Sequence, residues 1–125
     1  VCLNCRGGLT ISKNKIYMPF GNYGIYLNNC NTSLLSPGNV SNNFVTVGGS
    51  KNAYGIYVNN SDFTTLVYNN VRILSTASYG VAFYLGNYVV NTSTIASINN
   101  NYVNFKNIDY ISLVTFEFSN NFPLL

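Results

Sequence analysis

The sequence predicts an all-β fold in which short parallel strands stack in about four coils of a solenoid. Two motifs recur in phase along the chain, and both alternate apolar with polar residues at a period of two, the pattern of half-buried strands. The hairpin-forming pairs Asn-Gly and Asp-Gly are absent, which disfavours antiparallel hairpins. We therefore expect each strand to lie in register on the like strand of the preceding coil.

The first motif begins with Tyr-Gly and continues with alternating apolar residues. It occurs at 23–29 (YGIYLNN), recurs almost unchanged at 54–60 (YGIYVNN), is looser at 79–83 (YGVAF) and degenerate at 110–113 (YISL). Its apolar positions are expected to face the core. The outward positions are Gly24 and Tyr26, Gly55 and Tyr57, and Gly80 and Ala82.

The second motif is Asn followed by two apolar residues at a spacing of two. It occurs at 14–18, 43–47, 69–73 and 101–105. The expected inward residues are Ile16 and Met18, Val45 and Val47, Val71 and Ile73, and Val103 and Phe105. The residues between them, expected in solvent, are Tyr17, Thr46, Arg72 and Asn104. Like motifs stacked once per coil also predict Asn ladders at the corners.

The spacing of the two motifs favours a solenoid. From each motif Asn to the next motif Tyr the offset is 9–11 residues, whereas from that Tyr to the next Asn it is 15–22. One nearly fixed and one variable connection are typical of coils that close on one another while corner loops lengthen freely. A weaker third strand is expected at 9–12, 64–67 and 93–96.

These motifs resemble the repeat of the right-handed parallel β-helix, in the form YGIY-x-N-N and NN-x-V-x-V found in very large secreted and surface proteins of bacteria such as the Bacteroidetes. The resemblance covers residues 9–113 of a single segment, 1–125, and neither end resembles the amphipathic helix that caps such folds. It implies part of a longer chain in an extracellular or cell-surface protein. Family members are adhesins, stalks, and polysaccharide-binding or polysaccharide-cleaving proteins, so the fold leaves the function open.

The composition excludes several chemistries. The chain has no His and three acidic residues, Asp62, Asp109 and Glu117; the predicted register places the two Asp residues on different corners, which disfavours a paired carboxylate site. We expect no catalytic, cofactor or metal site. Six scattered basic residues form no nucleic-acid footprint, and no apolar run reaches the roughly 18 residues that insert into a membrane.

The cysteines and tyrosines leave alternatives open. Cys5 and Cys30 are separated by the shortest coil, so they are expected to stack within reach of a disulfide or as buried free thiols. Cys2 and Cys5 have CxxC spacing, but no second pair or His completes a structural zinc site. The candidate glycan-stacking residues are Tyr26 and Tyr57 in one outward column, Tyr17 on a neighbouring face and Tyr84 close to the column. The alternative is that these are ordinary strand tyrosines.

Three functions follow from these observations. The leading expectation is a non-catalytic structural or adhesive module that contacts glycans or host or cell-surface ligands. The second is a carbohydrate-binding or polysaccharide-processing domain whose active coils lie outside this segment. The third is a self-stacking filament subunit, because open parallel edges at both ends template further strands.

Overall fold

The computed structural model describes residues 1–30, 38–48, 52–61, 65–74, 79–86, 97–105 and 112–118. These residues form thirteen strands and contain no helix. Every strand pairing among them is parallel. The predicted all-β fold of parallel strands is therefore confirmed.

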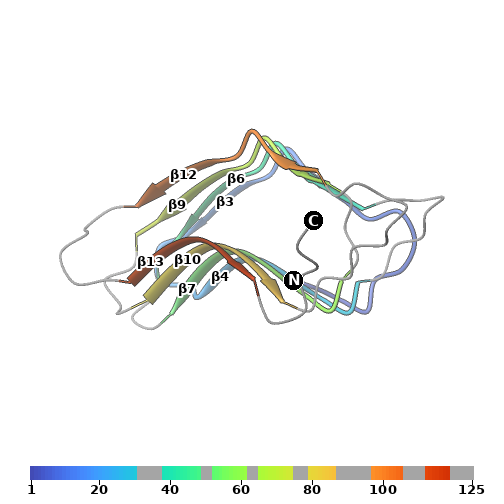
Figure 1. The fold of residues 1–125 in the computed structure, drawn as a ribbon, viewed down its shortest axis with the longest axis horizontal. Coiled ribbons are helices and arrows are strands. Elements are labelled where there is room, and N and C mark those ends of the chain that lie inside the picture. Colours follow the sequence, from blue (N-terminus) through green and yellow to red (C-terminus); the bar gives the residue numbers. More distant parts are fainter. Residues whose placement is uncertain are drawn as a thin grey trace.

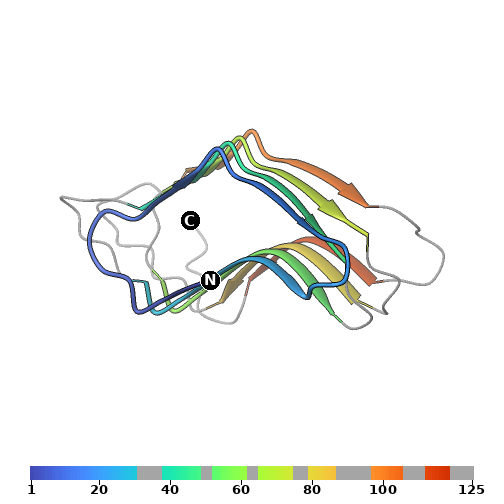
Figure 2. The same cartoon turned by 180° about the vertical axis from the view of Figure 1, so that it is seen from behind.

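The strands form three sheets that the chain visits in rotation (Figures 1 and 2). The first sheet contains, in spatial order, β1 (Cys2–Leu3), β4 (Tyr23–Asn28), β7 (Ala53–Asn59), β10 (Tyr79–Gly86) and β13 (Ser112–Phe118). The second contains β2 (Thr10–Ser12), β5 (Asn39–Ser41), β8 (Thr65–Val67) and β11 (Ser97–Asn99). The third contains β3 (Lys15–Met18), β6 (Phe44–Val47), β9 (Asn70–Ile73) and β12 (Tyr102–Phe105). We call one strand of each sheet, taken in succession, a repeat.

The core lies between the sheets and consists of like residues from successive repeats. Fully buried members include Val45, Val47, Val71 and Ile73 from the third sheet, Leu27, Ile56, Val58, Phe83 and Leu85 from the first, and Val40 and Leu66 from the second. The predicted inward column of the second motif is confirmed in the two inner strands. In β3, at the edge of the sheet, Ile16 is half-buried and Met18 is 45% exposed because no strand covers it on one side.

Thr46 does not face solvent as predicted, since it is buried. Its backbone partners on either side are Tyr17 and Arg72, both exposed. A short side chain between two long ones loses its access to water. Alternation along the strand alone could not predict this.

Two corners of the repeat adopt the same backbone conformation each time. At the corner between the second and third sheets, the left-handed residues are Lys13, Asn42, Tyr68 and Asn100, with φ between 52 and 58°. After the first-sheet strand the corresponding residues are Asn4, Asn29 and Asn60. Asn tolerates this conformation better than most residues, which explains why Asn occupies five of these seven positions.

The third copy of the first motif lies two residues further along the chain than predicted. Phe83 pairs with Ile56 and Tyr84 pairs with Tyr57. The expected alignment at 79–83 is wrong because Tyr79-Gly80 imitates the start of the motif. Val81 and Phe83 nevertheless face the core as predicted, because a shift of two residues keeps the same side chains on the same face of the sheet. The observed register adds Leu85 to this buried column, opposite Val58.

The repeat also extends beyond the predicted limits of 9–113. At one end β1 pairs with β4, and at the other β13 pairs with β10 along its length. Phe116 lies opposite Phe83 in the backbone register, so the fourth copy is not 110–113 as expected.

The third strand of the repeat is confirmed at β2 and β8. The expected copy at 93–96 lies outside the described residues, and β11 begins directly after it. β5 was not predicted from the sequence.

The small residues of the first motif lie between two sheets and do not face solvent as predicted. A Cβ on Gly55 would meet the Val71 Cγ1 methyl of the third sheet and would lie 2.6 Å from the Ala82 carbonyl oxygen. A Cβ on Gly24 would meet Val45 in the same way. Ala82 and Gly80 are buried as well. At Gly24 and Gly55 the two sheets approach too closely for any side chain.

Candidate functional site

Five tyrosines form two adjacent stacked columns on the first sheet, and we call them the tyrosine array: Tyr23, Tyr26, Tyr54, Tyr57 and Tyr84. In one column Tyr26 stacks on Tyr57 with ring centroids 5.0 Å apart, and Tyr57 stacks on Tyr84 at 4.4 Å. In the other column Tyr23 stacks on Tyr54 at 5.2 Å. Edge-to-face contacts of 5.0–5.8 Å join the columns.

The array follows from strand register. Tyr26 lies opposite Tyr57, and Tyr57 lies opposite Tyr84, across parallel pairs. Each ring therefore lies above the next, with interplanar angles of 6 and 7°. The two faces of the Tyr57 ring are covered by Tyr26 and Tyr84, so this ring presents only its edge to a ligand.

This geometry changes the interpretation of the predicted glycan-stacking residues. The structure brings Tyr26, Tyr57 and Tyr84 together, but Tyr17 lies on β3 of the third sheet and is 68% exposed. Tyr23 and Tyr54 belong to the array although they were not predicted as site residues. Their recurrence at the start of both YGIY copies was the signal that could have identified them.

Burial raises the pKa of Tyr57 and of Tyr23 above the usual value of 10.0. For Tyr57 the neighbouring Tyr84, Tyr26 and Tyr23 raise the pKa further, as does a hydrogen bond with Tyr84. For Tyr23 the further causes are Tyr54 and Tyr26. A phenolate is thus disfavoured within the array.

These pKa shifts predict alkaline destabilisation. The folded chain holds the phenol protons more tightly than the unfolded chain, so the free energy of unfolding falls as the pH rises above about 10. Below that pH the contribution is fully present. We expect the urea midpoint to be flat from pH 7 to 9 and to fall at higher pH, with a smaller fall in Tyr57→Phe. An equal alkaline response in that variant would contradict the assignment.

Four asparagines form a hydrogen-bonded ladder through the corner of the repeat, and we call them the asparagine ladder: Asn14, Asn43, Asn69 and Asn101. The Nδ2 of each of the first three donates to the Oδ1 of the next, at 2.9, 3.0 and 3.1 Å, across sequence separations of 29, 26 and 32. These are the motif Asn residues predicted from the sequence, so the expected ladder is confirmed.

The inner members of the ladder use their donors and acceptors within the protein. Asn69 Nδ2 also donates to the Val40 carbonyl at 2.9 Å, while its Oδ1 accepts from both Nδ2 and the backbone N–H of Asn43. Asn43 and Asn69 are buried. Because both donors of each amide and its oxygen are engaged, no polar atom of these two side chains is left for a ligand.

The three cysteines lie together where β1 meets β4. The structure links Cys2 to Cys5 in a disulfide and leaves Cys30 as a buried free thiol. The expected Cys5–Cys30 bond is therefore not the one formed. The predicted stacking of Cys5 on Cys30 nevertheless agrees with the strand register. Cys2 of β1 lies opposite Leu27 of β4, and this offset in residue number is the same as that between Cys5 and Cys30. The alternative of a buried free thiol applies to Cys30.

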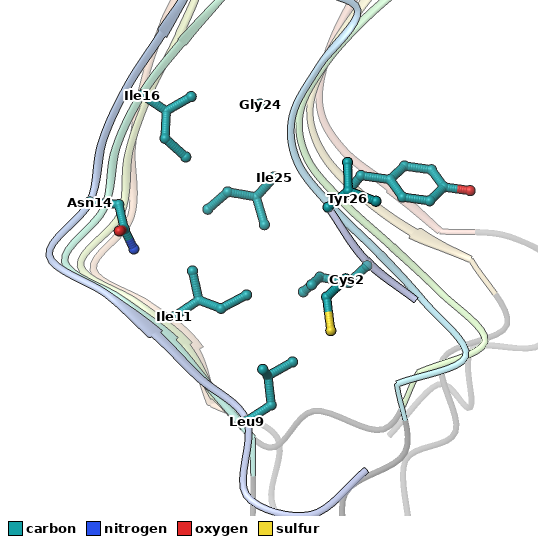
Figure 3. Close-up of a pocket in the computed structure, with 10 residues that line it drawn as sticks. Cys2, Leu9, Ile11, Asn14, Ile16, Gly24, Ile25 and Tyr26 are labelled. Carbon is teal, nitrogen blue, oxygen red and sulfur yellow. The ribbon is translucent and has the colours of Figure 1, made fainter. Parts of the chain in front are cut away.

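A pocket of about 320 Å³ opens at the end of the stack that contains β2 and β3. Leu9, Ile11, Ile16 and Ile25 point into it, whereas the Tyr26 ring projects to the opposite side of the strand (Figure 3). Cys2 also lines this pocket. These apolar side chains would belong to the core if another repeat lay above them.

Acidic groups are not gathered in the part of the chain that the structure describes. Asp62 and Asp109 lie outside the described residues, and Glu117 pairs through its backbone with Tyr84. The cysteine cluster is the one group of three potential metal ligands within the described ranges.

Comparisons of this chain with known proteins identify no similar protein. No protein-family model matches the chain, and neither the curated proteins nor the solved structures include a detectable match. Within the described residues there is also no helix with the length and apolar character needed to cross a membrane.

Proposed function

We propose that this chain is a non-catalytic structural module, a rigid spacer in a secreted or cell-surface protein, and that its strands form a right-handed parallel β-helix. The fixed rotation of the strands through three parallel sheets supports the helical path. Its handedness follows from the strong preference for right-handed connections between parallel strands of one sheet.

The observation that carries the proposal is that recurring polar and aromatic side chains bind their own copies in neighbouring repeats. Every polar side-chain atom of Asn43 and Asn69 is hydrogen-bonded, either to a neighbour in the asparagine ladder or to the backbone carbonyl of Ile11 or Val40. Tyr57 has a tyrosine on each face. Side chains that are used in this way stiffen a stack and offer little to a ligand.

The carbohydrate alternative requires an accessible aromatic face, because sugar rings stack on the face of an aromatic ring. The exposed tyrosines among the described residues are Tyr17, Tyr23, Tyr68 and Tyr102, and one face of the Tyr23 ring is stacked on Tyr54. Tyr17 lies on β3 and Tyr102 on β12, at opposite edges of the third sheet. Tyr23 lies on β4 of the first sheet. The exposed tyrosines therefore do not form one row, so the geometry favours the spacer over a glycan-binding surface.

The self-stacking alternative is favoured by one observation, the apolar pocket at the end of the stack. Half-buried Leu9, Ile11 and Ile16 would be covered by a further repeat there. Such a repeat could come from the same chain in a longer protein or from a second copy. The spacer proposal requires only the first.

Retention on immobilised polysaccharides and sedimentation velocity separate the three functions. A spacer is expected to pass through the polysaccharides unretained and to sediment as a monomer across a hundredfold concentration range. Growing oligomers would support the filament. Retention that is lost in folded Tyr26→Ala/Tyr57→Ala, but kept in Tyr26→Phe/Tyr57→Phe, would replace the spacer with a glycan-binding module.

Single substitutions of Tyr57 test the structural role of the tyrosine array. Tyr57→Ala removes two stacked and two edge-on ring contacts, so we expect it to lower the free energy of unfolding by about 2–4 kcal/mol. Tyr57→Phe keeps the rings and should cost less than half as much. Equal effects would show that the hydroxyl, not the stacking, carries the stability.

A further inference from the structure

The sulfur atoms of all three cysteines converge at one corner of the first two repeats. They lie within 4.8 Å of one another, and Cys30 Sγ is 3.5 Å from Cys2 Sγ. Cys30 is fully buried, whereas Cys2 and Cys5 are half-buried. Cys2 also lines the pocket at the end of the stack, which gives a small ion a path to the cluster.

The backbone holds this cluster in place independently of the sulfur chemistry. Asn4, in the left-handed conformation, donates its backbone N–H to the Asn28 carbonyl at 3.0 Å and turns the chain between the two cysteines. The backbone N–H of Cys30 donates to Ser61 Oγ at 2.9 Å. From these backbone bonds we expect the corners of two successive repeats to keep the three sulfurs together after the disulfide is opened.

The distances suit a metal ion bound by three thiolates. A metal–sulfur bond of about 2.3 Å places three sulfurs about 4 Å apart around the ion. The observed cluster needs only a small separation of Cys2 and Cys5, whose Cα atoms are 6.3 Å apart. No fourth His, Cys, Asp or Glu joins the cluster among the described residues, and the chain has no His.

We propose that the reduced chain binds one Cu(I) ion through Cys2, Cys5 and Cys30. Thiolates select soft ions, and a three-coordinate site suits Cu(I) better than Zn²⁺, whose structural sites take four ligands. This site goes beyond the spacer function and does not depend on it. The disulfide form has one thiol and cannot make the site.

A phosphine reductant breaks the Cys2–Cys5 bond and takes an oxygen atom from water, which yields the phosphine oxide and two thiols. With Cys30 the chain then has three thiols. Binding Cu(I) forms three Cu–S bonds and releases three protons, because the ligands are thiolates.

The test is anaerobic titration of the reduced, desalted chain into the coloured Cu(I)–bicinchoninate complex. We expect reduced wild type to withdraw one Cu(I) per chain and the disulfide form to withdraw none. Cys5→Ser, at a half-buried position, should weaken the affinity at least tenfold. Cys30→Ala should do the same if it remains folded, as circular dichroism would show.

The control is Tyr17→Ala, which removes an exposed side chain on another sheet and should leave the titration unchanged. The proposal is overturned if reduced wild type leaves the coloured complex intact. It is also overturned if Cys5→Ser withdraws copper as tightly as wild type, because binding would then not use the three sulfurs together.

Discussion

Replacing Val71 with Asp is expected to abolish cooperative folding. Val71 is fully buried between Val45 and Val103 in the backbone register, and one of its methyl groups faces Gly55 of the first sheet. A carboxylate there would lose its hydration without gaining a partner, at a cost above about 4 kcal/mol. Circular dichroism should show loss of the β signal and of any urea transition.

Arg72→Asp is the matched control for this substitution. Arg72 is the next residue on β9, is exposed, and lies beside Thr46 and Asn104. The same new side chain should therefore cost no more than about 1 kcal/mol, the span of strand propensities. If both variants fold with equal stability, Val71 does not face the core and the assigned register is wrong.

Replacing Asn69 with Ala is expected to lower the free energy of unfolding by about 3–5 kcal/mol, the second-largest effect that we predict. The variant removes the donor to the buried Val40 carbonyl and the acceptor for both the side-chain and the backbone N–H of Asn43. Each buried group left without a partner costs about 1–3 kcal/mol. Urea unfolding measured by circular dichroism should show a lower midpoint at an unchanged slope.

Position along the asparagine ladder provides the control. Asn14 is exposed at the end of the ladder and donates to Asn43 Oδ1 and to the Ser12 carbonyl. In Asn14→Ala water can hydrogen-bond the partners that Asn14 leaves, because the site is exposed. The free energy of unfolding should therefore fall by less than about 1.5 kcal/mol. If Asn14→Ala and Asn69→Ala lower the free energy of unfolding equally, burial does not determine the energy of the asparagine ladder.

Much of this architecture could be predicted from local patterns. Period-two alternation identified the strands of the second motif, because residues such as Val45 and Val47 must reach the core while their neighbours need not. The recurrent Asn before each of these strands predicted the ladder, because like residues recur once per repeat. The near-identical copies at 23–29 and 54–60 also predicted the pairing of Tyr26 with Tyr57, which the structure confirms.

The errors arose where a local pattern had two alignments or where a neighbour decided the outcome. Tyr79-Gly80 imitates the motif, but the backbone register places the true copy two residues later. Alternation could not distinguish the two alignments, because Val81 and Phe83 face the core in both. Gly55 alternates like an outward residue, yet the third sheet approaches it too closely for a side chain. For the cysteines, equal spacing predicted stacking, but the choice between Cys2 and Cys30 as partner of Cys5 depends on how the 2–5 turn directs its sulfurs.

The sequence by itself determined that the chain is built of stacked parallel strands, with apolar and Asn columns, and that it has no His and only three acidic residues. These properties follow from periodicity and composition, which each segment carries within itself. Only the tertiary structure decided that the tyrosine rings cover one another's faces and that three sulfurs meet at one corner. Both depend on the side-chain directions of residues about 25 to 31 positions apart, which no local pattern encodes.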